Sequence, residues 1–161
     1  MPDLPTGNIA TVRASLGRDT ADEILAFWAD HGALAGEQAR DRLPEVVCVL
    51  RDSAGRVAGV NSAYSDRVEL IAGRRFWIYR SFLAPGAGDA GPAMIAHAFA
   101  ALEREFEPGG DGPIGLCVLV RDRAEMERRP EAEWSDPRML YAGYDADGAQ
   151  VRIGYFAGAT I

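Results

Sequence analysis

The spacing of hydrophobic and polar positions changes along the chain, and each change predicts a different element. A weakly alternating stretch at 9–16 predicts a first strand, and apolar residues at helical spacing then follow Thr20-Ala-Asp-Glu23. Those four residues have the form of a capping box, so we expect a helix with Thr20 as its N-cap. A second short helix is expected over 36–43. Residues 45–51 are rich in β-branched side chains and predict a strand.

The middle of the chain predicts a meander followed by a crossover. Runs at 57–70 and 75–84 continue from the strand at 45–51 through short loops, which is typical of antiparallel strands. A long helix over 93–106 separates this meander from an almost wholly apolar run at 114–120. A strand, a helix and another strand in this order form a right-handed crossover, so we expect strands 75–84 and 114–120 to be parallel.

The last part of the chain predicts a short polar helix over 121–129, then an irregular stretch over 130–138 and a hairpin of 139–144 with 149–156. The whole order predicts an α+β (mixed α/β) fold. Its sheet would be mixed and mostly antiparallel, with six to seven strands and helices on both faces. At 161 residues the chain is expected to form a single domain, 1–161.

Composition and charge exclude several classes of function. The formal net charge is −7 and all 17 basic residues are arginine, which argues against nucleic acid as a partner and excludes lysine chemistry. Cys48 and Cys117 lie in apolar runs without metal-ligand spacing, so we expect two small buried hydrophobes and no metal. The sequence shows neither a signal peptide nor a bilayer-spanning run, which predicts a cytoplasmic protein with no membrane partner.

A glycine-rich turn links strand 75–84 to the long helix. Residues 86–91, Gly-Ala-Gly-Asp-Ala-Gly, fit G-x-G-x-x-G and would let backbone N–H groups approach a diphosphate at a helix N-terminus. A dinucleotide-binding sheet does not fit the wider order, because a meander precedes the turn and no second βαβ half follows. The plain alternative is a strand-to-helix turn with Asp89 as the N-cap.

With its neighbours, this turn resembles the GCN5-related N-acetyltransferase (GNAT) superfamily, and the resemblance covers nearly the whole element order. The acyl-CoA turn of that family reads Gln/Arg-x-x-Gly-x-Gly/Ala. Gly91 and Ala93 match it, whereas Gly88 stands where Gln or Arg is usual and Asp89 adds a negative charge. The resemblance implies acetyl-CoA as acyl donor, held by the backbone of Gly88, Asp89, Ala90, Gly91 and Ala93.

The resemblance also implies further cofactor contacts and an acceptor. Phe82, Leu83 and Ala84 would lie along the pantetheine arm as a strand-like partner. Arg121, with Arg123, would meet the 3′-phosphate of CoA, although solvated surface charge explains both arginines equally well. The acceptor would be an amine of a small molecule or a peptide.

Acetyl transfer needs a base for the amine and an acid for the leaving thiolate. Glu69 and Tyr79 are candidate bases; as alternatives, an edge-strand charge and a core tyrosine are expected at these positions. The family usually places an acidic Tyr on the helix after the buried strand, but residues 121–134 contain none. Tyr141 is then the candidate acid, with Tyr144 beside it.

Two other sequence features bear on function. Arg80 stands among apolar residues, which indicates a carboxylate partner or a bound anion. Exposed edges of the terminal hairpin are compatible with a homodimer. The leading hypothesis is therefore an acyl-CoA-dependent N-acyltransferase. The alternatives are a catalytically degenerate GNAT-fold module that binds a ligand or protein, and an unrelated α+β domain.

Overall fold

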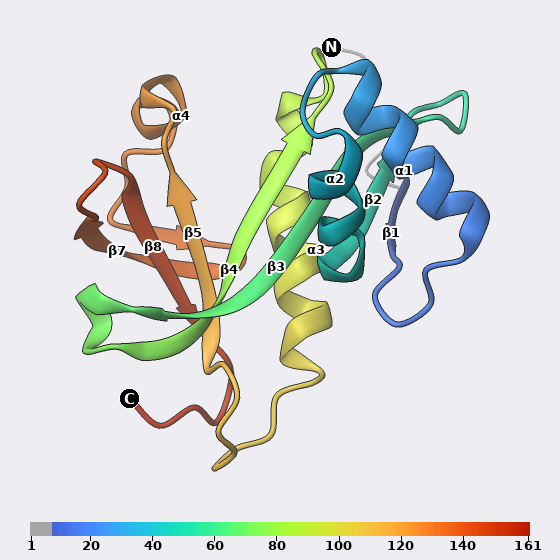
Figure 1. Cartoon of the computed structure of the whole chain (residues 1–161). Coiled ribbons are helices and arrows are strands. Elements are labelled where there is room, and N and C mark those ends of the chain that lie inside the picture. The colour runs from blue at the N-terminus through green and yellow to red at the C-terminus, as the bar shows by residue number, and fades with distance from the viewer. Residues whose placement is uncertain (1–7) are drawn as a thin grey trace. The chain divides into compact units, whose positions relative to one another are not determined.

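The computed structural model describes residues 8–161, and these divide into two compact units. Unit 1 comprises the chain up to Ala63 together with Ser81–Ala101, and unit 2 comprises Tyr64–Arg80 and Leu102–Ile161. In this part of the chain the strands follow the hydrogen-bonded order β1-β2-β3-β4-β5-β8-β7-β6. Strands β3 and β4 and helix α3 have residues in both units (Figure 1).

Unit 1 is a small sheet covered by helices. Strand β2 pairs antiparallel with both β1 and β3. Helix α1 buries Ile24, Phe27 and Trp28 in a core shared with the apolar side chains of β2 and β3. The elements of this unit are β1 (Ile9–Thr11), α1 (Arg18–Asp30), α2 (Gly36–Arg42), β2 (Val46–Arg51), and the unit-1 parts of β3 (Val57–Val68), β4 (Arg74–Leu83) and α3 (Gly91–Glu103).

Successive residues of β3 show that helices lie on both faces of the unit-1 sheet. Val60 belongs to the core formed with α1, whereas the next residue, Asn61, faces α3. The Asn61 amide is buried, accepts a hydrogen bond from the N–H of Cys48 at 2.7 Å and donates one to the carbonyl of Met94 in α3 at 3.0 Å. A buried amide that is satisfied on both sides fixes the helix against the strand.

Unit 2 contains the parallel pair of strands that the sequence predicts. Trp77, Ile78 and Tyr79 of β4 lie in parallel register with 116–118 of β5. Strand β8 continues the sheet antiparallel to β5, and β7 and β6 follow it (Figure 1). The elements here are β5 (Gly115–Val120), α4 (Arg123–Arg128), β6 (Glu133–Ser135), β7 (Arg138–Tyr144) and β8 (Gln150–Tyr155).

The most deeply buried charge of the described residues is in this unit. Arg152 of β8 is 1% exposed, and burial lowers its pKa. Its guanidinium donates to the Gln150 side chain at 2.9 Å and to the carbonyls of Arg129 and Glu131, and it lies 4.5 Å from the Trp134 ring centroid. Neutral oxygens and an aromatic face thus hold the segment after α4 against β8.

The α+β class and the mixed, mostly antiparallel sheet are confirmed, and Cys48 and Cys117 are fully buried thiols as predicted. Two local predictions are wrong. Helix α1 begins at Arg18, and its N-cap is Gly17, so Thr20 lies inside the first turn and caps nothing. The stretch 130–138 contains β6, in which buried Trp134 pairs with Met139, so the sheet has eight strands instead of six to seven.

Candidate functional site

The turn between β4 and α3 in unit 1 is exposed where a ligand would approach it. A 3₁₀ turn over Gly88–Ala90 leads directly into α3, and Gly86 before it has φ +88°. Gly88 and Asp89 are exposed, whereas Ala87 is buried beneath them. The N-cap of this 3₁₀ turn is Ala87, with no side-chain cap hydrogen bond, and Asp89 lies inside the turn instead of at its N-cap.

Two of the five backbone N–H groups expected to face a ligand are used within the turn itself. The N–H of Ala90 donates to the carbonyl of Ala87 at 3.0 Å, and that of Gly91 donates to the carbonyl of Gly88. The positions that remain as predicted donors are Gly88, Asp89 and Ala93, since Pro92 has no N–H. The positive end of the α3 dipole lies at the same place and favours an anion.

The space around the two glycines differs. A Cβ at Gly88 would meet no other atom within 4 Å, so this position is open to a longer side chain. A Cβ at Gly91 would lie 3.8 Å from Leu83 Cδ1, which is ordinary contact. Neither glycine has a positive φ, so substitution at either position imposes no backbone strain.

The strand residues before the turn have distinct roles in the fold. Phe82 packs edge-on against Phe27 of α1, with ring centroids 5.7 Å apart. Leu83 lies over Gly59 of β3, where a Cβ would approach to 2.5 Å of it. The N–H of Ala84 donates to the carbonyl of Ala58 at 2.8 Å. Contacts of these three residues with a pantetheine arm stay a prediction.

Unit 2 carries a separate hollow, which we call the acidic-rimmed pocket, with a volume of about 360 Å³. Its floor is apolar, and its rim holds four carboxylates, one arginine and two tyrosines. The segments that line it are the end of β3, the β3–β4 loop, the middle of β4 and β5, and the β7–β8 hairpin. The lining residues are Tyr64, Asp66, Arg67, Val68, Glu69, Leu70, Ile78, Cys117, Leu119, Tyr144, Asp145, Ala146, Asp147 and Val151.

The floor of this pocket excludes charge. Ile78 is 5% exposed, and Cys117 and Val151 are buried almost completely. Burial and, to a smaller extent, the negative charge of Asp145 together raise the pKa of Cys117 to about 12. The Cys117 thiol therefore stays protonated at neutral pH and acts as a small apolar group rather than a nucleophile.

The candidate catalytic residues do not come together. Glu69 is exposed and lines the acidic-rimmed pocket. Tyr79 is buried and follows Ile78 on the strand, so it faces away from that pocket. Tyr141 is exposed outside the pocket, whereas Tyr144, 5.9 Å from it between ring centroids, lines the wall. Their roles in catalysis remain predictions.

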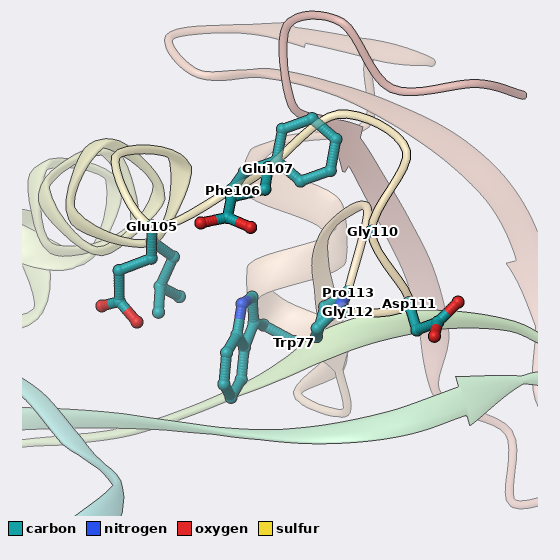
Figure 2. A pocket seen from close by; sticks show the side chains of 9 residues that line it. Trp77, Glu105, Phe106, Glu107, Gly110, Asp111, Gly112 and Pro113 are labelled. Atoms are coloured by element: carbon teal, nitrogen blue, oxygen red, sulfur yellow. The ribbon is translucent and has the colours of Figure 1, made fainter.

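A second hollow of about 200 Å³ lies elsewhere in unit 2, where the loop after α3 crosses β4. Figure 2 shows Trp77 on its strand with Glu105 and Glu107 on the loop nearby, and with the carboxylate of Asp111 directed away from the indole. This hollow lacks the broad buried floor of the acidic-rimmed pocket.

The arginines singled out in the sequence have different surroundings. Arg80 is half-buried and its guanidinium lies 4.3 Å from the centroid of the Tyr64 ring. Arg121 is exposed between β5 and α4, and exposed Arg123 is 3.5 Å from Glu127. A bound anion at Arg80 and a CoA phosphate at Arg121 stay predictions. Within residues 8–161, no three His, Cys, Asp or Glu side chains are placed to hold a metal ion.

Comparison with known proteins gives a match in structure only. No family model and no curated protein matches the sequence. The chain superposes on the acetyltransferase of the GNAT family from Streptococcus pneumoniae with a TM-score of 0.55 and 10% sequence identity. The match covers 92% of this chain and 98% of that one.

The match defines the class of fold. The chain has the fold of the GNAT acetyltransferases, an α+β architecture with a mixed, mostly antiparallel sheet, as the element order predicts. At 10% identity the likeness concerns the fold, and activity must be argued from the residues. No helix within residues 8–161 has the length and apolar character needed to cross a membrane.

Proposed function

We propose that the protein is an acyl-CoA-dependent N-acyltransferase that transfers an acetyl group to an amine. The observation that supports it best is the exposed 3₁₀ turn at Gly88–Ala90, which leads from a GNAT-fold strand into the N-terminus of α3. Backbone N–H groups and the helix dipole would receive the diphosphate of the acyl donor there. This mode of binding needs no lysine, and the chain has none.

The chemistry assigned to the protein is direct transfer. A neutral amine attacks the thioester carbonyl carbon, the C–N bond forms, the C–S bond breaks and CoA leaves as a thiolate that takes up a proton. Glu69 is the proposed base, because its carboxylate lies at the rim of the acidic-rimmed pocket. Tyr144, on the wall of the same pocket, is the tyrosine best placed to return a proton.

A catalytically degenerate binding module is the second candidate. It is favoured by Gly88 in place of the usual Gln or Arg, and by the absence of tyrosine from residues 121–134. Release of CoA thiol over a panel of amines separates the two functions. Thiol release that depends on both acetyl-CoA and an amine supports the enzyme. A rise in Tm with acetyl-CoA, without release for any amine, supports the module.

A further inference from the structure

The acidic-rimmed pocket has the size and chemistry of a small-molecule site. Its volume of about 360 Å³ lies within the range of ligand pockets and has room for about a dozen water-sized groups. That is the size of one small ring with a short side chain. A folded protein domain would contact the rim but could not enter.

The charges around this pocket favour a cation. Its rim holds the carboxylates of Asp66, Glu69, Asp145 and Asp147 against the single guanidinium of Arg67. Arg67 is directed to its own hairpin, where it donates to the carbonyl of Gly73 at 3.1 Å. A cation at the rim therefore meets an excess of negative charge.

The apolar floor restricts the positive charge to the outer end of the ligand. Val68, Ile78 and Val151 are at most 8% exposed, and Cys117 is wholly buried among them. A second charge that reached this floor would lose its water without gaining a partner. The ligand must therefore be apolar at its inner end and charged at its outer end.

We infer that the acidic-rimmed pocket receives the acceptor as a primary amine with a single positive charge on a compact apolar body, such as an arylalkylamine. The inference rests on the proposed function for its catalytic meaning, but binding to the pocket can be measured without any acyl donor. The apolar body fills the floor beside Cys117, and the ammonium group lies among the rim carboxylates. Loss of a proton from that ammonium near Glu69 yields the nucleophile.

Calorimetric titration of the full chain with 2-phenylethylamine, without acyl-CoA, tests the inference. We expect binding at least about tenfold tighter than that of 2-phenylethanol, which lacks the charge, and of methylamine, which lacks the apolar body. Equal binding of 2-phenylethanol and the amine would overturn the charge assignment. Equal binding of methylamine and the larger amine would overturn the role of the floor.

Two variants locate the binding. Leu119→Trp fills the pocket and should abolish binding, and Asp147→Asn removes one rim charge in a turn that tolerates Asn and should weaken binding about threefold or more. Asp111→Asn, in the other hollow, is the matched control and should leave the affinity unchanged. If Leu119→Trp lowers Tm sharply, its loss of binding reflects a destabilised fold, and the affinity of Asp147→Asn becomes the deciding measurement. Unchanged affinity in Asp147→Asn would then overturn the inference.

The two proposals fail in different ways. If the amine binds in the pocket but no thiol is released from acetyl-CoA, the proposed enzymatic function is wrong and the pocket remains a cation site. If thiol is released with peptides or polyamines but 2-phenylethylamine does not bind, the proposed enzymatic function stands and this inference is overturned.

Discussion

The turn at 86–93 in unit 1 and the acidic-rimmed pocket in unit 2 would recognise their proposed ligands by opposite means. The turn offers N–H groups from glycine and alanine, and its only charged side chain, that of Asp89, opposes an anion. The pocket offers side chains from both strands and loops around an apolar floor. A backbone site can therefore diverge in sequence and keep its chemistry, whereas a side-chain site changes specificity with each substitution.

The largest effect is expected at the turn. Gly91→Glu places a carboxylate where a diphosphate would approach and should weaken acetyl-CoA binding more than about a hundredfold, because like charges repel and the side chain blocks the backbone. Calorimetry with acetyl-CoA measures it. Gly112→Glu is the matched control, since a Cβ there meets nothing within 4 Å and one at Gly91 makes only ordinary contact. Normal binding by Gly91→Glu would show that the donor binds elsewhere.

Removal of the proposed base tests the catalytic role of the acidic-rimmed pocket. Glu69→Gln should lower kcat about a hundredfold, the usual contribution of a general base, with little change in KM. Glu107→Gln, in the other hollow, should keep full activity. A kcat for Glu69→Gln within about twofold of the parent would mean that another group or water takes the proton.

The comparison can be sharpened by giving the turn the side chain it lacks. Gly88→Arg restores the family's usual residue at an open position and should tighten acetyl-CoA binding about tenfold through charge-assisted hydrogen bonds to the diphosphate. Gly17→Arg, also at an open glycine with ordinary φ, controls for added positive charge. Equal gains in both variants would indicate a general charge effect and no specific contact.

The smallest effect concerns the pH dependence of unit 1. The hydrogen bond from Arg51, at 2.5 Å, lowers the pKa of Glu23. The contribution of the Glu23 carboxylate to stability is therefore fully present above the ordinary pKa of Glu, and it is lost as pH falls through the lowered pKa of Glu23. Tm of the parent should exceed that of Glu23→Gln slightly near neutral pH, and the gap should close in acid, as pH falls below the ordinary pKa of Glu. A gap that widens in acid would contradict this assignment.

The fold was largely predictable, because it depends on the order of long patterned segments. The crossover from β4 through α3 to β5 follows from a glycine-rich turn, a helix and an apolar run. Strand β6 was missed because three residues carry too little pattern, and its burial depends on pairing between Trp134 and Met139. The start of α1 was displaced because the capping box at Thr20 lies inside a longer helix.

The candidate site was predictable only where it is local in sequence. The turn occupies a continuous stretch, so its glycines could be found directly. The acidic-rimmed pocket brings together distant segments, and its floor residues Ile78 and Cys117 are indistinguishable from core in the sequence. Alternation along β4 separates Tyr79 from that floor, which residue type alone could not reveal.

The most direct test of the central claim compares CoA with pantetheine, which lacks the diphosphate and the nucleotide, by calorimetric titration of the full chain. If the turn at 86–93 holds the diphosphate, CoA should bind at least about tenfold more tightly than pantetheine, and Gly91→Glu should erase the difference. Equal affinity for the two compounds, or an advantage of CoA that survives Gly91→Glu, would contradict it.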